Sequence, residues 1–164
     1  MTKEQYARWS APIARHPNGP RILKGVNTLL TRLCYVCYPL LLLALALRRD
    51  GRFWRALLVP AVSFVLVSLF RRCLNAPRPY QVLDIQPLIH KDTRGKSFPS
   101  RHVFSVFMID MVWWYLCPPV GAVFFLAGVV LAAVRVLGGV HFPRDVIAGA
   151  LFAAAAGWAG FWLV

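Results

Sequence analysis

Five apolar runs separated by short polar stretches dominate this 164-residue chain. The runs cover residues 33–47, 56–70, 103–116, 120–134 and 146–164. A helix of fifteen residues rises about 22 Å, whereas the hydrocarbon core of a bilayer is about 30 Å thick. We therefore expect an all-α, polytopic membrane bundle of about five transmembrane helices, each extended through its flanking residues.

The first 21 residues have a different pattern, in which apolar Tyr6, Trp9 and Ile13 alternate with polar and basic positions. Such mixing predicts a short amphipathic helix lying at the membrane interface. The following HPNGP segment predicts a turn, and a new helix should begin near Arg21. We expect one domain over residues 1–164, with an interfacial segment at 1–21 and the functional bundle at 33–164.

Composition agrees with a bilayer as the solvent. The chain is 59% hydrophobic and 15% charged, whereas a soluble domain is about 45–50% apolar and about 25% charged. A very apolar soluble bundle is the less favoured alternative. The formal net charge of +13 could serve an anionic membrane, an anionic substrate or nucleic acid. Nucleic acid is disfavoured because the basic residues flank apolar runs instead of covering a soluble face.

Three polar clusters interrupt the apolar pattern, at residues 71–80, 97–102 and 135–145. Since consecutive membrane helices alternate in direction, all three clusters should meet at one face of the membrane. The side chains gathered there would be Arg71, Arg78, Ser100, His102, Arg135, His141 and Asp145. So many cations need an anion between them, and guanidinium groups match the oxygens of a phosphate. The clusters therefore predict a phosphate site.

Two histidines in these clusters suggest phosphoryl-transfer chemistry. Asp145 follows His141 by four residues, so its carboxylate could fix one ring nitrogen and leave the other free to attack phosphorus. His102, arriving on another helix, could protonate the leaving alcohol, which is typically worth about 10²–10⁴-fold in rate. Pro99 and Ser100 are typical of a helix start, where free backbone N–H groups favour an anion.

The spacing of these residues resembles the three-part signature of the PAP2 (type 2 phosphatidic acid phosphatase) superfamily. The first motif, Lys, six residues, Arg-Pro, corresponds to Arg71 and Arg78-Pro79. The second, Pro-Ser-Gly-His, corresponds to residues 99–102. The third, Ser-Arg, five residues, His, three residues, Asp, corresponds to Arg135, His141 and Asp145. Three positions depart from the pattern, namely Arg71 for Lys, Arg101 for Gly and Val134 for Ser.

The resemblance implies a role for each matched residue. His141 would form a phosphohistidine, Asp145 would orient it, and His102 would be the general acid. The residues implied to hold the phosphate are Arg71, Arg78, Ser100, Arg101 (through its backbone) and Arg135. The family needs no metal or other cofactor, and the sequence contains no carboxylate cluster suited to Mg²⁺ or Ca²⁺.

The remaining polar residues have simpler interpretations. Lys91, Arg94 and Lys96 are expected on a solvated loop face, although they could also meet a second phosphate or lipid headgroups. Asp110, midway along an apolar run, is expected to have a structural partner. The four cysteines are expected to pack without forming a disulfide framework, including the pair Cys34 and Cys37.

The small size resembles bacterial family members that recycle undecaprenyl diphosphate, which makes that lipid the preferred substrate. Phosphatidylglycerophosphate and phosphatidate are alternatives, as is a non-catalytic lipid-binding or transport protein. The expected partners are therefore a phosphorylated membrane lipid and the bilayer, while the oligomeric state stays open. We expect a multi-pass cell-membrane protein whose site faces the extracytoplasmic side, although the positive-inside rule, counted naively, favours the cytoplasm.

Overall fold

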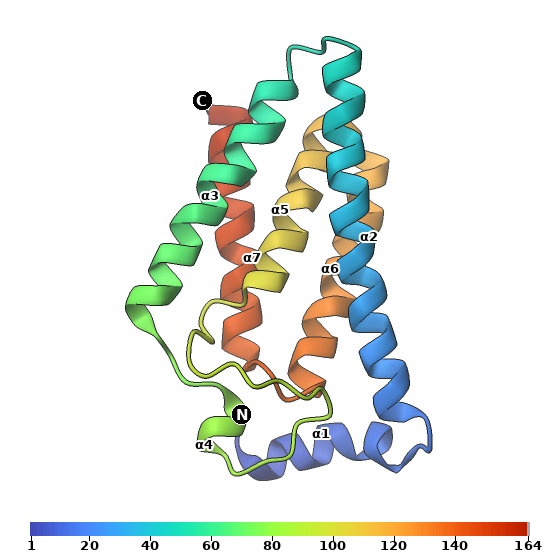
Figure 1. Cartoon of the computed structure of the whole chain (residues 1–164), viewed down its shortest axis with the longest axis vertical. Helices are drawn as coiled ribbons and strands as arrows, with labels where there is room; N and C mark the ends of the chain where they lie inside the picture. Colours follow the sequence, from blue (N-terminus) through green and yellow to red (C-terminus); the bar gives the residue numbers. More distant parts are fainter. Residues whose placement is uncertain (164) are drawn as a thin grey trace.

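The structure is a computed structural model that describes residues 1–163, and a bundle of long helices forms most of it (Figure 1). The elements are α1 (Lys3–Arg15), α2 (Gly19–Leu47), α3 (Phe53–Leu74), α4 (Pro79–Val82), α5 (Arg101–Leu116), α6 (Pro118–Leu137), α7 (Pro143–Trp158) and the π-helical turn η1 (Ala159–Leu163). The long helices α2, α3, α5, α6 and α7 correspond to the five apolar runs. The predicted all-α membrane bundle is therefore confirmed.

Four segments are long and apolar enough to cross a membrane. They are Gly19–Leu47, Phe53–Val82, Pro118–Leu137 and Pro143–Leu163. Each is longer than the apolar run that predicted it, so the expected extension through flanking residues is confirmed for these four. The 16-residue α5 is not extended in this way.

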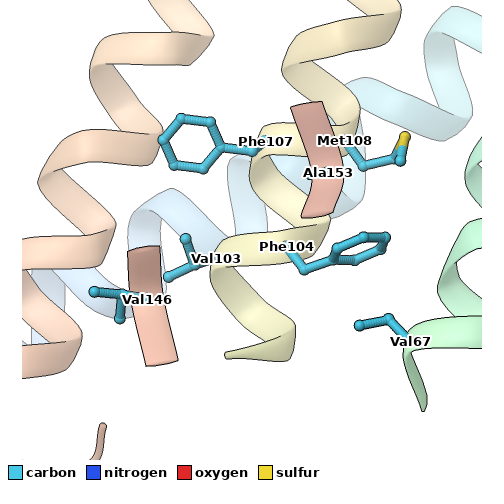
Figure 2. Packing of buried hydrophobic residues seen from close by; sticks show 7 residues of the cluster. All are labelled: Val67, Val103, Phe104, Phe107, Met108, Val146 and Ala153. Carbon is cyan, nitrogen blue, oxygen red and sulfur yellow. The ribbon is translucent and has the colours of Figure 1, made fainter. Parts of the chain in front are cut away.

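Helix α5 can be short because it is the central helix of the bundle, with α6 and α7 as its main neighbours (Figure 1). Half of its residues are buried. Its Val103, Phe104, Phe107 and Met108 pack against Val67 of α3 and against α7 (Figure 2). Most of its surface meets protein, so the length rule for lipid-facing helices applies less strictly to it.

The two ends of the bundle differ. One end carries the tight turn between α2 and α3, where Arg52 bonds Asp50 at 2.7 Å, together with the junction between α5 and α6 and the turn η1 (Figure 1). The other end carries the three polar clusters and α1, which lies crosswise beneath the bundle (Figure 1). Helix α1 is tied to the long loop after α4 by an ion pair of 2.9 Å between Lys3 and Asp84. The predicted meeting of the three clusters at one end is confirmed.

Helices α5 and α7 approach closely at this end. A Cβ added to Gly149 of α7 would lie 2.7 Å from the backbone oxygen of Ser100, which is closer than real contacts allow. The backbone N–H of Ser100 also donates to the backbone oxygen of Asp145 at 2.8 Å. The start of α5 is thereby fixed against the first turns of α7.

Candidate active site

A cavity of about 380 Å³ opens between the three polar clusters. The residues that line it are Ser68, Arg71, Arg72, Arg78, Lys91, Thr93, Lys96, Arg101, His102 and His141. Five of the eight predicted site residues are among them. Asp145, Ser100 and Arg135 are buried close by and do not line the cavity. The folded chain therefore brings the predicted residues together, with five lining the cavity and three buried behind its wall.

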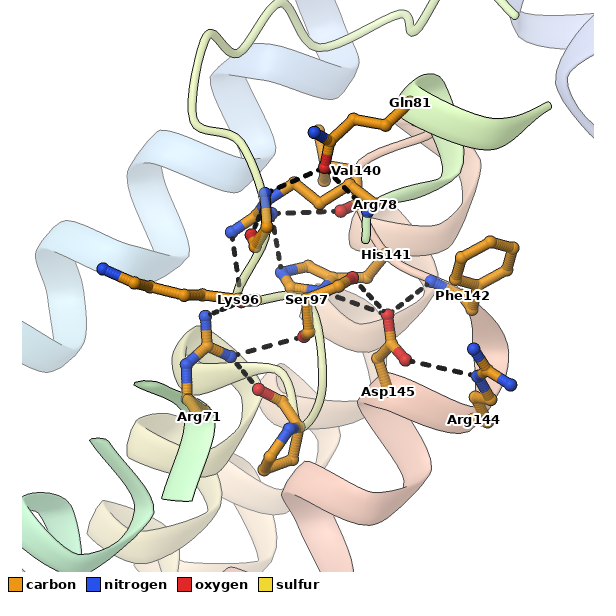
Figure 3. Close-up of polar contacts among 12 residues, drawn as sticks. Arg71, Arg78, Gln81, Lys96, Ser97, Val140, His141, Phe142, Arg144 and Asp145 are labelled. Carbon is orange, nitrogen blue, oxygen red and sulfur yellow. Dashed lines mark hydrogen bonds and ion pairs between the residues drawn. The ribbon is translucent and has the colours of Figure 1, made fainter. Parts of the chain in front are cut away.

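His141 forms the floor of this arrangement and is fully buried. Its Nδ1 lies 3.5 Å from Oδ2 of Asp145, and its Nε2 lies 3.4 Å from Nη1 of Arg78 (Figure 3). Burial lowers the pKa of His141, and Arg135 and Arg78 lower it further, although Asp145 acts in the opposite direction. The imidazole is therefore neutral at pH 7 and retains the lone pair that a nucleophile needs.

Asp145 is held in the first turn of α7, where Pro143 begins the helix. Its Oδ2 accepts hydrogen bonds from the backbone N–H of Phe142 at 3.0 Å and from Oγ of Ser97 at 2.5 Å. Capping a helix N-terminus is also favourable for a carboxylate because of the helix dipole. The orientation of Asp145 is thus fixed by groups other than His141.

Ser97 was not among the predicted site residues. It is fully buried, and its Oγ also lies 3.4 Å from Nδ1 of His141. It belongs to the long loop before α5 and opens the second polar cluster, in which only the motif residues 99–102 were assigned a role. The Ser97 hydroxyl therefore contacts both members of the His141–Asp145 pair.

Arg71 and Arg78 fasten this loop to the bundle. The guanidinium of Arg71, in the last turn of α3, donates to the backbone oxygens of Lys96, Ser97 and Pro99. That of Arg78 donates to Gly95 and Val140 oxygens, both at 3.1 Å (Figure 3). Both side chains are buried, yet both still line the cavity.

Arg135 and Ser100 retain unused donors. Nη1 of Arg135 donates to Oδ1 of Asn27 on α2 at 3.1 Å. Its Nε and Nη2, and the Oγ of Ser100, find no partner within the described residues. Buried donors without partners are costly in a folded protein. They are suited to an anion entering this region.

His102 lies beside an apolar region as well as the polar cavity. It also lines a small gap, of about 10 Å³, together with Cys34 and Tyr35. These two residues line a larger cavity, of about 270 Å³, enclosed by apolar side chains of α2, α3 and α5. The apolar cavity therefore adjoins the small gap beside His102.

The prediction of a solvated loop face is wrong for Lys91. Its side chain is half-buried and lines the cavity, because the loop after α4 folds over the site. Burial lowers its pKa to about 7, with further lowering by Arg135 and Arg78. Arg94 and Lys96 are exposed as expected, although Lys96 also contributes to the cavity wall.

Two other expectations have plain outcomes within residues 1–163. All four cysteines are free, as expected. Asp110 is buried, and its Oδ1 has no hydrogen-bond partner within the described residues, so no structural partner is found for this oxygen. No group of three or more His, Cys, Asp or Glu side chains suited to a metal ion occurs among these residues.

The fold and the site define a helical membrane protein with a histidine–carboxylate pair facing a basic cavity. The family model of the PAP2 superfamily matches residues 52–164. The protein belongs to the PAP2 superfamily, as its three motifs predicted.

Individual relatives agree with this placement. Over 96 residues the chain is 31% identical to lipid A 1-phosphatase of Rhizobium johnstonii. The matched region is 56% of this chain and 39% of that protein. The chain thus spans well under two thirds of that relative. LpxE of Aquifex aeolicus has 29% identity and a TM-score of 0.74, covering 96% of this chain and 92% of LpxE. The fold is shared with a transmembrane PAP2 type phosphatidylglycerolphosphate phosphatase of Bacillus subtilis (23% identity, TM-score 0.67, coverage of 98% and 82%).

Proposed function

We propose that this protein is a membrane lipid phosphatase that transfers a phosphoryl group to His141 and then to water. The observation that carries the proposal is the orientation of the His141 ring, with Nδ1 facing Asp145 and Nε2 facing Arg78 at the basic cavity. A carboxylate on one ring nitrogen fixes the tautomer whose other nitrogen has a free lone pair. Family membership supports the same assignment.

In the proposed mechanism, Nε2 of His141 bonds to phosphorus while the bond from phosphorus to the lipid oxygen breaks. His102 gives a proton to that oxygen, and the leaving group departs, as a lipid alcohol from a monophosphate or as a lipid monophosphate from a diphosphate. Water then attacks the phosphohistidine and releases inorganic phosphate. Guanidinium groups and backbone N–H groups at the start of α5 stabilise the negative charge of both transition states. These steps use only protein groups and water, so the proposed reaction needs no metal ion or cofactor.

The identity of the lipid is the finer part of the proposal. The apolar cavity beside His102 supports a substrate with a hydrocarbon tail. Undecaprenyl diphosphate is the preferred candidate, with phosphatidylglycerophosphate and phosphatidate as alternatives. The similarity to lipid A 1-phosphatase adds lipid A 1-phosphate to the panel of lipids to be tested as substrates. A non-catalytic lipid-binding or transport protein is the competing class, and it predicts no phosphate release.

The test is phosphate release by the purified protein in detergent micelles, measured with each lipid. Wild type should release phosphate, and His141→Ala should lose at least about 10³-fold of that rate, because no other group replaces the nucleophile. His16→Ala, in the exposed turn between α1 and α2, is the matched control and should retain activity. Equal release by wild type and His141→Ala would contradict the proposal. A phosphohistidine trapped from radiolabelled substrate in the wild type would support the covalent step.

A further inference from the structure

The basic cavity between the three polar clusters, here called the phosphate cavity, carries more positive charge than one phosphate group can neutralise. The Arg and Lys side chains that line it are Arg71, Arg72, Arg78, Lys91, Lys96 and Arg101. No Asp or Glu is among its lining residues in the described part of the chain. A phosphate monoester carries about two negative charges at pH 7. The buried Arg71 and Arg78 can balance these charges, which leaves cations for another anionic group.

Arg101 is placed on the lipid side of this cavity. Its guanidinium carbon lies 5.6 Å from the ring centroid of Phe64. Phe64 lines the apolar cavity between α2, α3 and α5, and it precedes Arg71 in α3 by two turns, or about 10 Å of helix. Since Arg101 also lines the phosphate cavity, its side chain lies where the polar and apolar cavities adjoin.

The direction of the leaving group points to the same junction. His102, the proposed general acid, follows Arg101 in α5 and lines both the phosphate cavity and the gap toward the apolar cavity. In an in-line displacement the leaving oxygen is on the side of phosphorus opposite to the attacking His141 nitrogen. The group that links the reacting phosphorus to the hydrocarbon therefore lies beside His102 and Arg101.

Resting on the function proposed above, we infer that Arg101 binds the second phosphate of a lipid diphosphate and makes the enzyme prefer a diphosphate to a monophosphate. Nε2 of His141 bonds to the terminal phosphorus, and the bond from that phosphorus to the bridging oxygen breaks. The electron pair stays on this oxygen, so a lipid monophosphate leaves. Water then cleaves the nitrogen–phosphorus bond and releases inorganic phosphate. The Arg101 guanidinium neutralises the charge that the leaving phosphate gains.

The experiment compares farnesyl diphosphate with farnesyl monophosphate, which share one hydrocarbon chain, in the same detergent micelles. Initial rates of phosphate release give kcat/KM for each substrate, and their ratio is the measured quantity. Wild type should favour the diphosphate. Arg101→Gln should lower the ratio about tenfold or more, because a charge-assisted hydrogen bond made only by the second phosphate is lost. Arg101→Lys should restore part of it, since a point charge lacks the bidentate fork.

Arg94→Gln is the matched control, because it removes the same charge from an exposed loop position outside the phosphate cavity. The ratio should be unchanged in this variant. If Arg101→Gln leaves the ratio unchanged, or if Arg94→Gln lowers it equally, the inference about Arg101 is overturned while the phosphatase assignment stands. If wild type hydrolyses neither farnesyl substrate nor any lipid of the panel, the proposed function itself fails.

Discussion

Nδ1 of His141 lies 3.5 Å from Oδ2 of Asp145, while Nε2 on the opposite edge of the same ring lies 3.4 Å from Nη1 of Arg78. Each ring nitrogen therefore has its own environment, one anionic and one cationic. Because the ring is fully buried, it cannot exchange these environments without moving its neighbours. A single orientation of the imidazole is thus built into the fold.

Ser97 should matter for catalysis more than for binding. Ser97→Ala removes the 2.5 Å hydrogen bond to Asp145, and we expect kcat to fall about tenfold with little change in KM, since the carboxylate is less well oriented. Phosphate release at several substrate concentrations measures both constants. Ser10→Ala is the control, because its buried hydroxyl donates to the backbone oxygen of Tyr6 within α1. A purely structural role would instead lower the amount of folded protein without changing kcat.

The need for His102 should depend on the leaving group. An alkoxide requires a proton as it leaves, whereas a phosphate leaving group, whose second pKa is about 6, is stable without one. His102→Asn should therefore slow hydrolysis of a lipid monophosphate about 10²-fold or more, and that of the matching diphosphate much less. Parallel rate measurements on farnesyl monophosphate and farnesyl diphosphate test this. Equal losses on both substrates would remove His102 from the role of general acid.

Lys91 should make kcat/KM decrease on the alkaline side of the pH profile. Its pKa, lowered by burial to about 7, means that the side chain is charged below pH 7 and loses its charge as pH rises through this value. The site then attracts phosphate less, so kcat/KM should fall about tenfold above pH 7. In Lys91→Arg the charge persists and this decrease should disappear. If the decrease is unchanged in Lys91→Arg, another group is responsible for it.

The contact between α5 and α7 offers a test of packing. Gly149→Ala places a Cβ 2.7 Å from the Ser100 backbone oxygen, which must push the two helices apart. We expect a loss of about 1–3 kcal/mol of stability and a lower rate, because the segments carrying His102 and His141 separate. Gly25→Ala is the control, since nothing lies within 4 Å of its added Cβ. Thermal unfolding in detergent compares the two variants, and equal unfolding temperatures would contradict the expectation.

Sidedness can be measured with single cysteines. In a background that lacks the native cysteines, Thr93→Cys places a thiol in the exposed loop at the site, and Gly51→Cys places one in the turn at the opposite end. For a site that faces outward, as we propose, an impermeant maleimide added to intact cells should label Thr93→Cys and not Gly51→Cys. The reverse pattern would place the site in the cytoplasm.

The bundle and the meeting of the polar clusters followed from sequence because both depend on simple patterns. Apolar runs of helical length predict the helices, and the alternating direction of α3, α5, α6 and α7 brings the clusters to one end. Residues at or next to the helix ends, such as Arg71, His102 and His141, therefore line the cavity as expected. The pattern could not reveal that α5 is surrounded by protein, because apolar residues face lipid and protein alike.

Loop residues were harder to predict, because their positions depend on the path of a segment without regular structure. Ser97 is 48 residues away from its partner Asp145, and no periodicity connects them. Lys91 has the composition of a solvated loop, yet the loop folds back over the site and half-buries it. Such contacts are defined only when the loop is held in place by Arg71 and Arg78.

These two arginines bond the backbone oxygens of the loop, so protein groups themselves hold the loop in place. The conformational entropy of the loop is therefore lost when the chain folds, and not when a phosphate arrives. A site ordered in advance binds its anion with little further loss of freedom. The same preordered site also binds the released inorganic phosphate, so we expect inorganic phosphate to inhibit the enzyme as a product.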